Sequence, residues 1–185
     1  GYNSSESSEL QGYVPGPATE KEWAETYPLE KEALDYFINN AGSPNGVIDG
    51  GIPVFAAGNE YAPNPAFPGA YSKCVCVASL AADYTPACYT DYGQLVTLSA
   101  PGGDLEYYGK IGEAEDEYWA ETAEQKGAVL STMIKNGKPA YGYMEGTSMA
   151  CPHVSGVAAL GLSYATKQHR HYRAADFIAL MKKSV

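Results

Sequence analysis

The 185-residue chain carries 12 lysines and arginines against 22 aspartates and glutamates, a formal net charge of −10 at neutral pH. Such an acidic chain is repelled by phosphate backbones and anionic lipids, so its composition argues against a nucleic-acid partner. Hydrophobic residues make up 45% of the chain, yet no apolar run approaches the ~20 residues of a transmembrane helix. The composition predicts one globular domain with no membrane span.

The amino-terminal part is predicted to be a surface segment followed by two helices. Residues 1–18 are rich in Ser, Gly, Pro and Glu and lack hydrophobic periodicity, which is typical of a surface segment. Thr19–Glu22 has the spacing of a capping box, so a helix is expected to start there. Pro28 fits the first turn of a helix but not its interior, which predicts a break near Tyr27 and a second helix to about Asn40. The apolar face of that second helix would consist of Leu29, Ala33, Leu34, Phe37 and Ile38.

Four short apolar runs further along the chain have the length and composition of buried strands. The first run ends at Gly58-Asn59, and turn signals such as Asp91-Tyr92-Gly93 separate later ones. Short apolar strands combined with helices predict an α/β fold in which helices flank both faces of a mostly parallel sheet. The four runs are residues 52–57, 74–79, 95–100 and 128–133.

An acidic segment, residues 104–126, contains eight carboxylates and two lysines between two of these runs. Such a segment is predicted to be a solvated surface insertion. Clustered carboxylates are also the ligands that calcium prefers, but the D-x-[DN]-x-[DN]-G pattern of a calcium loop is missing from the sequence. Calcium binding therefore stays open with no ligand assigned, and nothing in the sequence requires a cofactor.

The four cysteines, Cys74, Cys76, Cys88 and Cys151, are too sparse for a disulfide framework. Cys74 and Cys76 lie two residues apart in an apolar run, so they share a strand face and are not placed to bridge. A zinc site is disfavoured because the C-x-C pair has no second ligand pair nearby. We expect buried free thiols, with one disulfide to Cys88 or to a neighbouring chain as the alternative.

The last third of the chain is predicted to be helical. A first helix from Ser148 to about Tyr164 and a second from Arg173 to about Lys183 both carry an apolar face. Ser148 stands where a strand end turns into the first helix, so its hydroxyl projects at the positive end of the helix, where an oxyanion is best tolerated. Pro152 is expected within the first turn or so, where a missing amide costs little. The first helix has Val154, Val157, Ala158, Leu160 and Leu162 spaced as in a helix buried against a sheet.

The stretch Gly146–Gly156 resembles the nucleophile motif of the subtilisin-like serine proteases (subtilases, peptidase family S8), G-T-S-M-A-x-P-H-x-x-G. All eight specified residues match, and a chance match in a chain of this length is on the order of 10⁻⁸. Phe55–Asn59 is similar to the family's A-A-G-N strand end, and the likeness covers roughly residues 47–185. The resemblance implies a three-layer, subtilisin-like α/β fold, with residues 1–185 forming its carboxyl-terminal part and the amino-terminal side incomplete.

The resemblance also implies roles for individual residues. Ser148 would be the nucleophile that becomes acylated by a peptide or protein substrate, and Asn59 would donate to the oxyanion together with the Ser148 backbone N–H. One wall of the pocket for the residue before the scissile bond would be formed by Ala56, Ala57 and Gly58. Glu60, which directly follows the oxyanion Asn, is expected at the rim or floor of that pocket, where it would favour basic or polar side chains.

The catalytic base that this chemistry needs is missing from the sequence. A serine protease of this family uses a His and an Asp that precede the Ser, yet no histidine precedes Ser148, and neither D-[ST]-G nor H-G-T occurs. His153 lies five residues after Ser148, so helix geometry turns it about 140° away. His169 and His171 lie among basic residues beyond that helix and are expected to face solvent.

Two functions remain open at this stage. In the first, the chain is part of an extracellular or cell-envelope endopeptidase whose Asp and His lie on a missing amino-terminal partner segment, so that the isolated chain is inactive. In the second, it belongs to a non-catalytic relative that keeps the fold as a binding or scaffold module. The residues upstream of Gly1 would discriminate between them. Localisation outside the cell is implied by the family alone, since no signal peptide is present in this chain.

Overall fold

A computed structural model describes residues 16–42, 46–108, 119 and 127–185. Residues 1–15 of the predicted surface segment and most of the acidic segment, 109–118 and 120–126, lie outside the described residues. No helix in the described part of the chain is long and apolar enough to cross a membrane.

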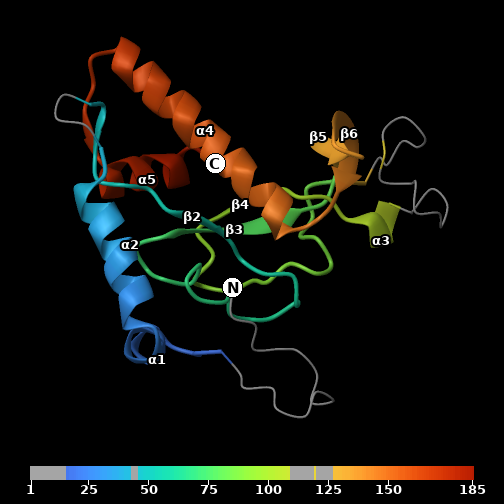
Figure 1. The fold of residues 1–185 in the computed structure, drawn as a ribbon, viewed down its shortest axis with the longest axis horizontal. Helices are drawn as coiled ribbons and strands as arrows, with labels where there is room; N and C mark the ends of the chain where they lie inside the picture. The colour runs from blue at the N-terminus through green and yellow to red at the C-terminus, as the bar shows by residue number, and fades with distance from the viewer. Residues whose placement is uncertain (1–15, 43–45, 109–118, 120–126) are drawn as a thin grey trace.

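Three short parallel strands form the central sheet, as the sequence predicts. Strands β2 (Val54–Ala56), β3 (Val75–Leu80) and β4 (Leu98–Pro101) are hydrogen-bonded in the order β2-β3-β4 (Figure 1). All residues of β3 but the last are buried, because β3 is the middle strand and both of its faces are covered. A second, two-residue parallel pair joins β1 (Ile48–Asp49) to β7 (Tyr172–Arg173).

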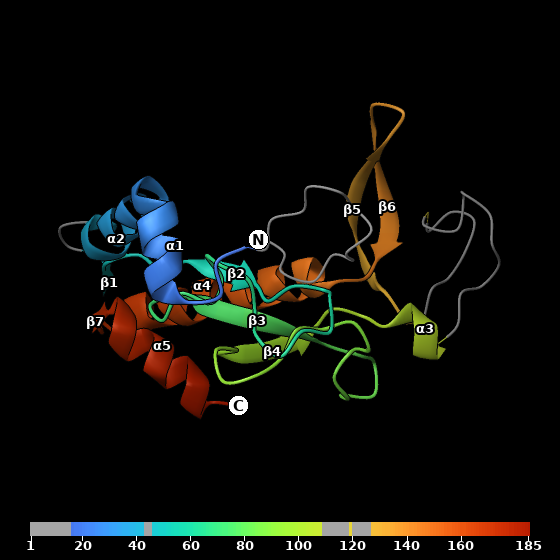
Figure 2. The same ribbon diagram turned by 90° about the horizontal axis from the view of Figure 1, so that it is seen from below.

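The fourth apolar run is not a parallel strand, and that prediction is wrong. Strand β5 (Val129–Lys135) pairs antiparallel with β6 (Lys138–Met144), and Figure 2 shows the two strands projecting from the body as a hairpin. Asn136 and Gly137 form the turn with φ angles of 53° and 74°. Positive φ at both central residues favours a two-residue hairpin turn, so the Asn-Gly pair explains the pairing.

Helices flank the sheet on both faces, as predicted. The long helix α4 (Thr147–Lys167) runs across β2, β3 and β4, and α5 (Ala174–Lys183) joins the same apolar cluster (Figure 1). A second apolar cluster forms around Trp23 of α1 (Glu20–Thr26), and α2 (Pro28–Asn40) packs against it. Val54 packs against the first cluster and its neighbour Phe55 against the second, so the clusters lie on opposite faces of β2.

The capping box and the break before Pro28 are confirmed. The Thr19 hydroxyl accepts a hydrogen bond from the Glu22 amide at 3.2 Å, and the Glu22 carboxylate accepts from the Ala18 amide at 2.9 Å. The carboxylate thus reaches one residue further back than the usual reciprocal bond to the capping residue. The predicted apolar face of α2 is only partly right, because Leu34 and Ile38 pack against the second cluster whereas Leu29 is 79% exposed.

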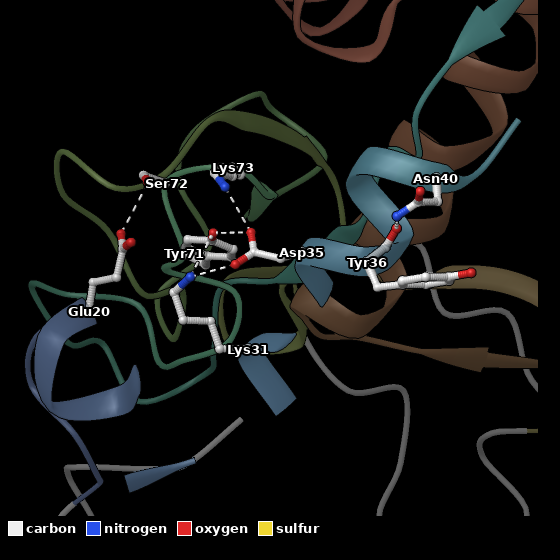
Figure 3. Close-up of polar contacts among 8 residues, drawn as sticks. All are labelled: Glu20, Lys31, Asp35, Tyr36, Asn40, Tyr71, Ser72 and Lys73. Atoms are coloured by element: carbon white, nitrogen blue, oxygen red, sulfur yellow. Dashed lines mark hydrogen bonds and ion pairs between the residues drawn. The ribbon is translucent and has the colours of Figure 1, made fainter. Parts of the chain in front are cut away.

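A charged cluster fastens α2 to the loop that leads into β3 (Figure 3). The Asp35 carboxylate accepts hydrogen bonds from Lys31 at 2.5 Å, Tyr71 at 2.5 Å and Lys73 at 2.8 Å. Lys31, Lys73 and Tyr71 together hold the pKa of Asp35 well below its ordinary value. We call these four residues the Asp35 clamp. Next to it, Ser72 donates to Glu20 of α1 at 3.0 Å.

Three further predictions agree with the structure only in part. Asp104, assigned to the solvated acidic segment, is fully buried and accepts a hydrogen bond from the Cys88 amide at 2.7 Å. All four cysteines are free, as expected, but only Cys74 and Cys76 are buried, and burial raises the pKa of each to about 12. On α4, Val157 and Leu160 are 62% and 73% exposed, so only the opposite face of this helix is buried in the described structure.

Candidate active site

Ser148 lies at the amino-terminal end of α4. Gly146 has a φ of 142°, a backbone conformation that a residue with a side chain adopts only under strain. The helix begins at the next residue, Thr147. Ser148 is therefore the second helical residue, and its exposed side chain stands where the helix dipole is positive. Pro152 lies inside the helix, in the second turn rather than the first. It has no amide to donate to the Ser148 carbonyl, which is the acceptor four residues back.

The side chain of Asn59 is oriented by two hydrogen bonds from Thr147. The Thr147 backbone N–H donates to Asn59 Oδ1 at 2.9 Å, and the Thr147 hydroxyl donates to the same oxygen at 2.8 Å. Because a backbone N–H can only donate, the atom that faces it is the amide oxygen, and the NH₂ group points the other way. A Cβ placed on Gly146 would lie 3.6 Å from Asn59 Nδ2 and 3.7 Å from the Ser148 nitrogen. Two nitrogen donors, Asn59 Nδ2 and the Ser148 N–H, therefore lie close together beside Gly146.

A cavity of about 180 Å³ opens next to Ser148. Larger cavities of about 330, 590 and 670 Å³ lie elsewhere, but neither Ser148 nor Asn59 lines any of these three. The small cavity brings together all six residues that the sequence proposes for the site and adds two that it does not. Its lining consists of Ala56, Ala57, Gly58, Asn59, Glu60, Ala66, Thr147 and Ser148.

Asp91 braces the loop that carries Asn59, and the sequence analysis missed this role. Asp91 is 2% exposed, and its Oδ1 accepts hydrogen bonds from the backbone amides of Glu60 at 3.0 Å and Ala62 at 2.8 Å. Its own amide donates to the Gly58 carbonyl at 3.0 Å. The sequence marks Asp91 only as part of a turn, because nothing local indicates contacts with residues 29 and 31 positions away.

The carboxyl groups of Glu60, which lines the cavity, and of Asp91 both lie close to Gly58. Glu60 Oε2 accepts a hydrogen bond from the Asn59 backbone amide at 2.9 Å. A Cβ built on Gly58 would collide with Asp91 Oδ2 and would lie 2.7 Å from Glu60 Oε2. Burial, and the Glu60 carboxyl group after it, raise the pKa of Asp91 to about 6, although the Ala62 and Glu60 amides act in the opposite direction.

Comparison with known proteins identifies the family. The subtilase family model matches residues 3–185. The chain belongs to the subtilase family. It is 36% identical to halolysin of Haloferax mediterranei over 110 residues, which cover 60% of this chain and 16% of halolysin. It is 34% identical to an extracellular basic protease of Dichelobacter nodosus over 117 residues, 63% of this chain and 16% of that protein.

A solved structure agrees with this assignment. A protease from Pseudoalteromonas arctica matches 71% of this chain at 30% identity with a TM-score of 0.55, and the match covers 35% of that protease. The parallel sheet flanked by helices is therefore part of the subtilisin-like α/β fold. The chain spans about a sixth of these two curated relatives and about a third of the solved protease.

None of the histidines of this subtilase chain lines the cavity beside Ser148. His153 is exposed on α4, and its Nδ1 lies 2.8 Å from the Met149 carbonyl oxygen. His171 lies 2.8 Å from Asp49 and 2.8 Å from the Gly46 carbonyl oxygen at the β1–β7 pair. Asp49, and the Gly46 carbonyl after it, raise the pKa of His171. His169 is exposed and follows α4 with a φ of 54°.

No metal site is formed by the described residues, which include no group of three or more His, Cys, Asp or Glu side chains placed to hold an ion. Most of the acidic segment lies outside those residues. The calcium hypothesis therefore stays a prediction.

Proposed function

We propose that this chain supplies the nucleophile, the oxyanion hole and part of the substrate pocket of a serine endopeptidase. The observation that carries the proposal is the placement of Ser148 at the end of α4 beside the Asn59 NH₂ group, which Thr147 orients. A hydroxyl next to two N–H donors that lie close together is an arrangement suited to stabilising a tetrahedral oxyanion. Family membership and the protease relatives support the same activity.

In the proposed mechanism Ser148 Oγ bonds to the carbonyl carbon of the scissile peptide, while its proton passes to an imidazole. Asn59 Nδ2 and the Ser148 N–H donate to the oxygen that becomes negative. The C–N bond then breaks, and the amine leaves with the proton from the imidazole. Water hydrolyses the acyl ester on Ser148 by the same route. In a subtilisin, loss of the corresponding Asn was measured to cost about 10²–10³ in kcat, and we expect a similar loss here.

The catalytic His and Asp are proposed to lie on further polypeptide that packs against this chain. Three observations support this: the chain covers a minor part of its relatives, no histidine lines the cavity, and α4 exposes an apolar stripe. The stripe consists of Val157, Leu160 and Tyr164, which are 62%, 73% and 66% exposed. Their spacing of three and four residues places them on one helix face, where a packing partner would bury them. By itself the 185-residue chain should be inactive.

The substrate is proposed to be an extracellular or envelope peptide or protein. Ala56, Ala57 and Gly58 would form one wall of the pocket for the side chain before the scissile bond, because their backbone and small side chains leave space next to Ser148. The Glu60 carboxylate at the same cavity would favour a basic or polar side chain. The name of the D. nodosus relative, an extracellular protease, supports the location.

Labelling by a fluorophosphonate tests the proposal. The protein to use is the parent polypeptide, in which this chain is joined or paired with the residues that supply the base. We expect Ser148 to be labelled, as mapped by peptide mass spectrometry, and the Ser148→Ala variant to stay unlabelled. Ser155→Ala is the matched control, because Ser155 is an exposed serine on the same helix that donates to the Cys151 carbonyl. The isolated chain should be labelled negligibly, since no base activates the hydroxyl.

Three outcomes would contradict the proposal. Labelling of another residue would refute the assignment of Ser148, and rapid labelling of the isolated chain would mean that one of its own histidines acts as the base. A parent polypeptide that is folded but unreactive would favour the alternative function, a non-catalytic binding or scaffold module. That alternative is supported by the lack of a histidine at the cavity of this chain.

A further inference from the structure

The carboxyl group of Asp91 lies directly behind the backbone that forms the pocket wall. Its Oδ1 holds the amides of Glu60 and Ala62, and its Oδ2 lies against Gly58, a residue that lines the cavity. The side chain is almost completely buried, so bulk water screens it little. A charge on Asp91 would therefore act on a group in the cavity across the backbone of Gly58.

Glu60 shares this environment from the cavity side. Its Oε2 accepts a hydrogen bond from the Asn59 amide, and both Glu60 Oε2 and Asp91 Oδ2 lie close to the position that a Cβ on Gly58 would take. Burial and the neighbouring Glu60 carboxyl group disfavour the ionised form of Asp91. Asp91 therefore keeps its proton at low pH and adds a negative charge beside Glu60 after losing it.

We propose that Asp91 holds a proton behind the pocket wall, next to Glu60, and that loss of this proton on raising the pH strengthens the preference for lysine or arginine before the scissile bond. This inference rests on the proposed endopeptidase function. Asp91 acts as a positioning and specificity-determining residue, since it touches the loop and not the reacting atoms. Ionisation of Asp91 adds one negative charge close to the pocket that would receive a cationic side chain.

Two other titratable groups face Asp91. From the loop after β2 the Glu60 carboxyl faces it, and from β3 the Cys76 thiol lies within electrostatic range. The Cys76 thiol stays neutral over the working range because burial raises its pKa to about 12. The pKa of Asp91, about 6, places the change within the range where such a protease can be assayed.

The test compares two peptide substrates that differ only in having lysine or norleucine before the scissile bond. With the parent polypeptide, the ratio of the two kcat/KM values is measured from pH 5 to pH 8. The ratio cancels the titration of the catalytic histidine, because both substrates depend on it equally, and lysine stays charged throughout. We expect the ratio to rise about tenfold around pH 6.

Two variants and a control sharpen the test. Asp91→Asn keeps an oxygen acceptor for the Glu60 and Ala62 amides but removes the titration, so the ratio should become independent of pH. Glu60→Gln should lower the lysine preference at every pH. Asp176→Asn, a change of the same charge on α5, should keep the wild-type rise, because Asp176 is exposed and pairs with Arg173.

A ratio that does not change with pH in the wild type, or that still rises in Asp91→Asn, would overturn the inference while the endopeptidase function stands. If no peptide is cleaved and Ser148 is not labelled, the proposed function itself fails. The proton on Asp91 can then still be judged from ¹³C NMR titration of its carboxyl carbon in the wild-type polypeptide. This carbon should report a step near pH 6, and a step near the ordinary value of an aspartate would contradict the inference.

Discussion

Two aspartates brace loops on this subtilase chain, the partly exposed Asp35 and the buried Asp91, and their surroundings are opposite. Asp35 of the Asp35 clamp accepts hydrogen bonds from two lysines and a tyrosine, which hold its pKa well below the ordinary value. Asp91 braces the loop of Asn59 next to a second carboxyl group, and its pKa is raised to about 6. Ionisation therefore stabilises the fold at Asp35 and destabilises it at Asp91. The unfavourable arrangement is the one beside the candidate active site, which is where perturbed groups commonly gather.

The substitution Gly58→Ala is expected to have the largest effect, because it places a methyl group against the carboxyl groups of Asp91 and Glu60. Gly58→Ala would push a Cβ into Asp91 Oδ2 and close to Glu60 Oε2, at a φ of 124° that side chains rarely adopt. We expect a loss of about 3 kcal/mol in the free energy of unfolding, measured by urea denaturation. Gly137→Ala is the matched control, since its φ is also positive, at 74°, but a Cβ there meets nothing within 4 Å. Equal losses in the two variants would mean that the acid pair is not packed against Gly58.

Asp35→Asn should destabilise the protein by about 1–2 kcal/mol at neutral pH, because Lys31 and Lys73 lose their shared counter-charge. The folded pKa of Asp35 is lowered, so its contribution is present above the unfolded pKa, near 4, and is lost as the pH falls through the folded value. The difference between wild type and variant in urea denaturation should therefore shrink below about pH 4. If the difference in the free energy of unfolding between wild type and Asp35→Asn grew below pH 4, Asp35 and Asp91 would not have opposite pH dependences.

Asp91→Asn should show the opposite pH dependence. The folded pKa is raised, so the contribution of Asp91 is present below the unfolded pKa and is lost as the pH rises through about 6. Relative to wild type, the variant should gain about 1–3 kcal/mol between pH 4 and pH 8 in the same urea experiment. If the difference in the free energy of unfolding between Asp91→Asn and wild type stayed constant from pH 4 to pH 8, the pKa of Asp91 would not be raised.

The smallest effect is expected at His171, which directly precedes β7 and whose exposed imidazole pairs with Asp49 of β1. Its folded pKa is raised, so its contribution is present below the unfolded pKa, near 6.5, and is lost at higher pH. His171→Ala should lower the melting temperature slightly at pH 5.5 and leave it unchanged at pH 9. His169→Ala, at an exposed neighbouring position, is the control and should not change it at either pH.

Sequence patterns predicted those parts of the fold that depend on local chemistry. Thr19 and Pro28 marked two helix boundaries correctly, because a cap and a proline act on the adjacent backbone. The run at 128–133 was misread as a parallel strand, since its apolar residues outweighed the Asn136-Gly137 turn signal that pairs it with β6. Burial of α4 was overestimated for the same reason, because an apolar pattern does not say whether a partner surface is present.

The candidate site was predictable as far as its motif extends. The stretch around Ser148 and the strand end at Asn59 were found from their residues, and the structure places them at one cavity. The bond from Thr147 that orients Asn59 spans 88 residues, and the brace from Asp91 spans 31. Contacts of that kind are decided by the packing of the sheet and leave no local trace in the sequence.

The most direct test of the central claim is a crystal structure of the parent polypeptide after reaction with a fluorophosphonate. The account predicts a phosphonyl group bonded to Ser148 Oγ, with its oxygen within hydrogen-bond distance of Asn59 Nδ2 and the Ser148 N–H. An adduct on another side chain would contradict the account, and so would a phosphonyl oxygen turned away from Asn59.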